Sequence, residues 1–94
     1  MPETKQLLRK IPGGKLLRIS CVVDDAVIRQ ISIRGDFFMY PEEAVYDIES
    51  SLTGLPLDTE ILRKRIDETA AEKNIEITGF SAQDLAETIT GEHQ

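Results

Sequence analysis

The chain has 94 residues, a length that suits one domain with a modest hydrophobic core. Seventeen acidic residues outnumber eleven basic ones, and the net charge of −6 repels phosphate backbones and disfavours nucleic-acid binding. The sequence has no apolar run of about 18 residues, no signal-peptide core and no lipidation motif, so we expect a cytoplasmic protein without membrane contact. The initial methionine favours a whole gene product: a single domain over 1–94, with its core at about 11–90 and a polar tail at 91–94.

The N-terminal part has the pattern of an antiparallel sheet. Two segments, 15–23 and 27–34, alternate apolar and polar residues with the period of a strand that buries one face. The sheet has two strands, or three if an edge strand over 7–10, before the turn signal at 11–14, also pairs. The side chains predicted to face inward are Leu17, Ile19, Cys21 and Val23 in the first segment and Val27, Ile31 and Ile33 in the second.

Three helices are predicted downstream of the sheet. The first spans Pro41–Leu52, where proline suits the first turn and Glu42 and Glu43 face the positive end of the helix dipole. The second begins at an N-cap, Asp58, and ends at Asn74. The predicted buried stripes of these two helices are Ala44, Val45, Ile48 and Leu52, and Ile61, Leu62, Ile66 and Ala70.

The third helix begins at Ser81, whose spacing to Asp84 is that of a capping box, and ends at Gly91. A short extended piece, 75–78, precedes it. Helices that present apolar stripes to a two- or three-stranded sheet predict a small α+β domain. The residues expected to face inward from this helix are Leu85, Ala86 and Ile89.

The sequence contains no catalytic constellation. Cys21 is the only cysteine, so no internal disulfide can form, and its mid-strand position favours a core residue over a reactive thiol, which needs exposure and a positive neighbour. His93 is the only histidine and lies in the tail without an orienting partner. No histidine and cysteine cluster has metal-ligand spacing, so we predict neither catalytic nor metal-binding residues.

The glycines before Lys15 admit two interpretations. Gly13-Gly14-Lys15 could form part of a phosphate-binding loop, but such a loop leads into a helix and this lysine leads into a strand. A turn is therefore favoured. A Lys15 that reaches toward a phosphate held by another protein stays as the alternative.

The segment Gly35-Asp36-Phe37-Phe38 is the best candidate for a binding surface. Gly35 lets the chain leave the strand sharply, and Asp36 can orient the loop. Four large side chains in a row, from Phe37 to Tyr40, cannot all enter one small core. Either two pack under the helices and the rest are merely exposed, or the outward ones anchor an interface.

These motifs together resemble the C-terminal accessory domain of lipoate–protein ligases. The resemblance covers about 11–89, and the joint order and spacing of the pieces are more specific than any one of them. The residues that carry it are Pro12-Gly13-Gly14-Lys15-Leu16-Leu17-Arg18-Ile19, Ile31-Ser32-Ile33-Arg34-Gly35-Asp36-Phe37-Phe38, Pro41-Glu42-Glu43, Ile48-Glu49, Leu52-Thr53-Gly54 and Ile77-Thr78-Gly79-Phe80-Ser81-Ala82-Gln83-Asp84-Leu85-Ala86.

The resemblance implies a fold similar to the SufE/NifU class and a role as the separate small subunit of a two-chain ligase. Such a ligase activates lipoate with ATP to lipoyl-AMP and then transfers the lipoyl group to a lysine of lipoyl-domain proteins. ATP, Mg and lipoate would bind in the catalytic subunit and no cofactor in this chain. The residues expected at or near the contact with that subunit, or near its adenylate site, are Lys15, Gly35, Asp36, Phe37 and Phe38.

Two rival interpretations remain open from the sequence. A sulfur-acceptor or scaffold protein would need an exposed cysteine on a loop, and a mid-strand Cys21 argues against it. A stand-alone interaction module unrelated to lipoylation predicts no affinity for a ligase subunit.

Overall fold

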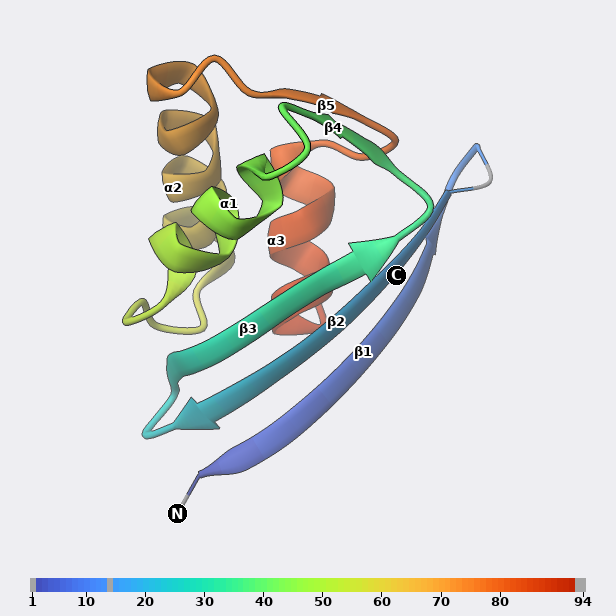
Figure 1. Cartoon of the computed structure of the whole chain (residues 1–94). Helices are drawn as coiled ribbons and strands as arrows, with labels where there is room; N and C mark the ends of the chain where they lie inside the picture. Colours follow the sequence, from blue (N-terminus) through green and yellow to red (C-terminus); the bar gives the residue numbers. More distant parts are fainter. Residues whose placement is uncertain (1, 14, 93–94) are drawn as a thin grey trace.

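Three consecutive strands form the larger sheet of the protein, which a computed structural model describes for residues 2–13 and 15–92 (Figure 1). The strands pair antiparallel in the order β1-β2-β3. Asp25 and Ala26 form the tight β2–β3 turn with φ of 58° and 60°, and the twist of such a turn matches that of the strands. The edge strand predicted over 7–10 is present and extends further in both directions. The bounds are β1 (Glu3–Ile11), β2 (Lys15–Asp24) and β3 (Val27–Gly35).

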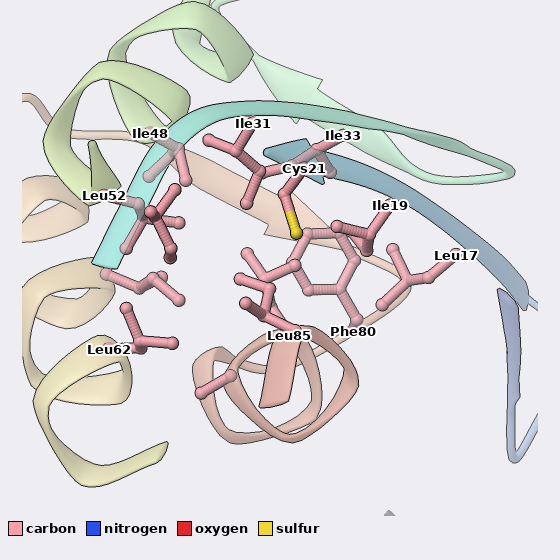
Figure 2. Close-up of a cluster of buried hydrophobic side chains, with 14 of the residues drawn as sticks. Leu17, Ile19, Cys21, Ile31, Ile33, Ile48, Leu52, Leu62, Phe80 and Leu85 are labelled. Atoms are coloured by element: carbon pink, nitrogen blue, oxygen red, sulfur yellow. The ribbon is translucent and has the colours of Figure 1, made fainter. Parts of the chain in front are cut away.

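The inward face of this sheet forms one side of the hydrophobic core (Figure 2). All four inward residues predicted for the first long strand are buried. In β3 the prediction is partly wrong, because the register shifts between Val22 and Val23 and inserts one extra residue. Ile28 is therefore fully buried, and Val27 is only partly buried.

Three helices cover this face (Figure 1): α1 (Ala44–Leu52), α2 (Thr59–Glu72) and α3 (Ala82–Thr90). Helix α1 begins three residues later than predicted, because the segment from Pro41 forms turns first. Ile61 was predicted to be buried but is 43% exposed, since the buried stripe of α2 is centred on Leu62, Ile66 and Thr69. Within the described residues, no helix has the length and apolarity needed to cross a membrane.

The predicted caps at the starts of α2 and α3 and at the end of α3 are confirmed. The Asp58 carboxylate accepts a hydrogen bond from the Ile61 N–H at 3.0 Å at the start of α2. At the start of α3, Ser81 and Asp84 each accept the other's backbone N–H at 3.0 Å, the reciprocal bonds of a capping box. Gly91 follows α3 with φ of 77°, so the left-handed position falls on a glycine.

A second, two-stranded sheet was not predicted. Strand β4 (Phe38–Tyr40) follows β3 and pairs antiparallel with β5 (Glu76–Thr78), which precedes α3. Figure 1 shows this pair beyond the end of β3, on the side of the sheet that carries the helices. The pairing joins segments almost forty residues apart and fixes the path of the chain after Gly35.

Candidate functional site

The five residues predicted for the contact with another protein lie together at one corner of the molecule. Lys15 opens β2, Gly35 ends β3, and the next three residues lead into β4. All five line one open depression of about 450 Å³. We call this site the Lys15–Phe38 corner; it consists of Lys15, Gly35, Asp36, Phe37 and Phe38.

The shape of the corner depends on Gly35. Its φ is +146°, and a Cβ atom placed on it would lie 1.9 Å from the carbonyl oxygen of Leu16. The next residue, Asp36, donates its backbone N–H to that same oxygen at 2.9 Å. The chain can therefore turn away from β2 only because residue 35 has no side chain.

The two phenylalanines of the corner have different environments. Phe37 is partly buried and packs edge-on against Phe80, with ring centroids 5.1 Å apart and an interplanar angle of 85°. Phe38 is 73% exposed, and the Lys15 Nζ lies 5.8 Å from its ring centroid, within cation–π range. One ring thus fixes the corner to the core, and the other is presented to solvent beside a positive charge.

The run of four large side chains divides between core and surface, a division that both interpretations share. Met39 is buried with Phe37 against the core, whereas Tyr40 is 71% exposed like Phe38. Alternation along β4 explains why Met39 is buried between the exposed Phe38 and Tyr40, because successive strand residues point to opposite faces.

Tyr46 on α1, which was not predicted as a site residue, extends this exposed aromatic surface. Tyr46 is 59% exposed and lines, together with Phe38 and Val45, a second depression of about 350 Å³ next to the corner. Its position two residues from both Ala44 and Ile48 places it opposite the buried stripe, so the helical period contains this signal. Three of the five aromatic side chains of the chain are exposed in this region.

Cys21 is a core residue, as its mid-strand position predicted. It is 1% exposed, and in Figure 2 its sulfur lies among the buried side chains near Phe80. Burial raises the pKa of the thiol, and the positive charge of Lys5 opposes this rise. A protonated, buried thiol is a poor nucleophile, which argues against a sulfur-acceptor role.

The remaining sequence candidates, a phosphate-binding loop and a metal-binding cluster, do not form a site in the described residues. Gly13, with φ of 105°, lies in the turn before Lys15, which enters a strand and not a helix. Gly14 and His93 lie outside the described residues, as does the end of the predicted polar tail. Within 2–13 and 15–92, no group of three or more histidine, cysteine, aspartate or glutamate side chains could hold a metal ion.

Comparison with known proteins identifies the family. A family model described as the bacterial lipoate protein ligase C-terminus matches residues 4–89, so the chain belongs to this family, as the resemblance predicted. It is also similar to lipoate-protein ligase A subunit 2 of Thermoplasma acidophilum, with 37% identity over 43 residues. That match spans 46% of this chain and 46% of the relative, less than half the length of either.

The fold comparison agrees with the family. A chain in the solved structure of a bi-partite lipoate protein ligase and its E2 lipoyl domain, also from Thermoplasma acidophilum, superposes with a TM-score of 0.79. The two chains are 25% identical, and the match covers 95% of this chain and 97% of the other. The predicted α+β fold of a ligase accessory domain is thereby confirmed.

Proposed function

We propose that this chain is the accessory subunit of a two-chain lipoate–protein ligase in the cytoplasm. Its membership of the family supports this proposal, as do relatives described as one subunit of a ligase and as part of a bi-partite ligase. In this assembly the catalytic subunit holds ATP, Mg and lipoate, and this chain binds no cofactor. The protein substrates, lipoyl-domain proteins, meet this chain only through the assembled ligase.

The Lys15–Phe38 corner docks on the catalytic subunit. The observation that carries this step is the exposed Phe38 ring beside Lys15, held by a backbone that Gly35 and Phe37 fix to the core. Exposed aromatic side chains on a rigid support are typical interface anchors. Desolvating the ring on docking stabilises the complex, and Lys15 adds a cation that can lie near a phosphate-bearing site.

The subunit contributes mainly to the first half-reaction, the activation of lipoate to lipoyl-AMP. Attack on the α-phosphate of ATP concentrates negative charge, and a site that is ordered and poor in water stabilises that charge better. A domain docked beside the site can complete such a geometry without a nucleophile or base of its own. It then moves as a rigid body to admit the protein that accepts the lipoyl group.

The proposed role is tested with the purified catalytic chain, with and without this subunit. Pyrophosphate release in the presence of lipoate and ATP reports the first half-reaction. We expect lipoyl-AMP formation to be rapid only when both chains are present. Equal rates with and without this chain would refute the role in activation.

A pair of variants tests the docking surface. Phe38→Ala should weaken binding to the catalytic subunit by about tenfold or more, because it removes an exposed aromatic anchor. Ile61→Ala is the matched control, since Ile61 is a large apolar side chain that is 43% exposed on α2, away from the corner. Both proteins should keep the wild-type melting temperature within a few degrees. Equal affinities for the two variants would place the interface elsewhere.

A further inference from the structure

The outward face of the three-stranded sheet is uncovered, because all three helices lie on the opposite face (Figure 1). The centre of this face is positively charged. Arg18 of β2 lies directly opposite Arg34 of β3, and on its other side it is opposite Leu8 of β1. An open depression of about 520 Å³ crosses the three strands here, lined mainly by Gln6, Leu8, Arg18, Ser20, Ser32 and Arg34.

This positive face contrasts with the acidic chain as a whole. Residues 1–34 carry seven of the eleven basic side chains and only three of the seventeen acidic ones, although Lys5 and Arg9 lie on the helix-facing side, where Arg9 pairs with carboxylates of α3. The outward positions of β1 and β2 add Lys10 to the cations, and the first carboxylate on this side, Asp24, lies at the hairpin end of β2. The sheet layer is therefore basic, and the helical layer carries the excess of carboxylates.

The Arg18–Arg34 pair costs stability within the chain. Like charges directly opposite each other on neighbouring strands repel. Arg34 has a partner in Glu49, at 3.2 Å between Nη1 and Oε2, but within the described part of the chain Arg18 forms no ion pair. An external anionic partner would relieve this repulsion.

We propose that this face binds an acidic surface of the protein that accepts the lipoyl group. The inference rests on the proposed function, and charge complementarity favours an acidic partner. Helices α1–α3 and β4 lie on the other side of the sheet, so within the described residues no helix covers this face (Figure 1). Since Arg34 directly precedes Gly35, a protein bound here would also lie next to a catalytic subunit docked at the Lys15–Phe38 corner.

The surface chemistry of the depression suits a protein partner. The depression is wide and open, so it would hold a small molecule poorly and a convex protein surface well. Ser20 and Ser32, opposite each other, offer hydroxyl groups, and Leu8, 63% exposed, offers an apolar contact. Exposed charges of this kind act mainly by speeding association, an effect that falls with salt.

The test compares Arg18→Glu with Lys64→Glu in the assembled two-chain ligase. Both substitutions change the net charge equally, but Lys64 is exposed on α2, away from this face. The substrate is the apo-lipoyl domain of an acyltransferase, and the two half-reactions are measured separately. At low salt, Arg18→Glu should raise KM for the apo-lipoyl domain by about fivefold and weaken its salt dependence. Lipoyl-AMP formation should not change, and Lys64→Glu should behave as the wild type.

Several outcomes would overturn the inference. An unchanged KM for Arg18→Glu, or an equal rise for Lys64→Glu, would remove the role of this face. A loss of lipoyl-AMP formation with Arg18→Glu would assign the face to the catalytic subunit. If single-stranded DNA inhibits transfer by the wild type but not by Arg18→Glu, the face binds nucleic acid instead. Failure of the proposed function gives a different result: lipoyl-AMP would then form at the same rate without this chain.

A second substitution at residue 18 controls for effects on folding. Arg18→Gln removes the repulsion with Arg34 and should melt at the wild-type temperature or higher, while KM for the apo-lipoyl domain still rises. A stabilised variant with weakened transfer cannot be explained by loss of structure.

Discussion

At the scale of single residues, adjacent side chains at the Lys15–Phe38 corner differ in burial. The path of the backbone determines which side chain is buried and which is exposed. Phe37, in the connection before β4, packs on Phe80, while Phe38, the first residue of β4, is exposed. Gly35 fixes the path of this connection, since its backbone approaches β2 closely. A single atom added at this position should therefore disturb the whole corner.

We expect Gly35→Ala to lower the free energy of unfolding by about 3 kcal/mol or more, because strained φ and a backbone clash at 1.9 Å combine. Gly54→Ala is the matched control: its φ of +92° is also unfavourable, but nothing lies within 4 Å of the added atom. That variant should lose only about 1 kcal/mol. Urea denaturation of both variants measures the difference, and similar losses would contradict the proposed close approach.

The buried thiol of Cys21 predicts a pH dependence of stability. Burial raises the pKa of this group above its ordinary value of 9.0 in the folded protein, so above that pH the unfolded chain releases its proton first. Its contribution is fully present below the unfolded pKa and is lost as the pH rises through the folded pKa. The free energy of unfolding should fall more between pH 7 and pH 10 in the wild type than in Cys21→Val. Parallel curves would show that the thiol does not titrate in this way.

At the scale of elements, the free edge of β3 is covered by side chain and loop. The Glu49 carboxylate on α1 accepts the Ile33 N–H at 2.7 Å and also pairs with Arg34. Further along, the segment 54–57 forms backbone bonds to Ile28 and Ala26. Exposed strand edges invite pairing with other chains, so this cover protects the monomer from aggregation.

Glu49→Ala should cost about 1–2 kcal/mol, because it leaves the Ile33 N–H without its acceptor. It should also promote association of the free chain, visible by sedimentation at high concentration. Glu49→Gln keeps an amide oxygen at the same place and should lose less in both measurements. Equal behaviour of the two variants would show that the carboxylate charge, and not the hydrogen bond, protects the edge.

The elements and the core could largely be predicted from the sequence, but their long-range pairing could not. Alternation identified the sheet, and local capping chemistry identified Asp58 and Ser81, because both signals act over a few residues. The extra residue near Val22 shifted the face of Val27, since nothing in the local pattern marks a bulge. The residue types of Gly35–Phe38 and Lys15, together with the family motifs, predicted the five corner residues, whereas the basic sheet face becomes visible only when three strands lie side by side.

At the scale of the whole molecule, charge is separated between the two layers. The helical layer and its connections carry fourteen of the seventeen carboxylates, and the sheet layer carries most of the cations. The molecule therefore presents different electrostatic surfaces to different neighbours. Such a distribution orients the protein during encounters and acts before any contact forms.

The pairing of β4 with β5, together with the packing of Phe37 on Phe80, has one more consequence. Every residue of the Lys15–Phe38 corner lies in the first half of the chain, but part of what holds the corner, strand β5 and the ring of Phe80, lies between Glu76 and Phe80. A polypeptide emerging from the ribosome thus already contains these five residues long before it can hold them in position. On the docking proposed above, only a nearly finished chain has the surface that binds the catalytic subunit, so premature fragments are left out of the assembly.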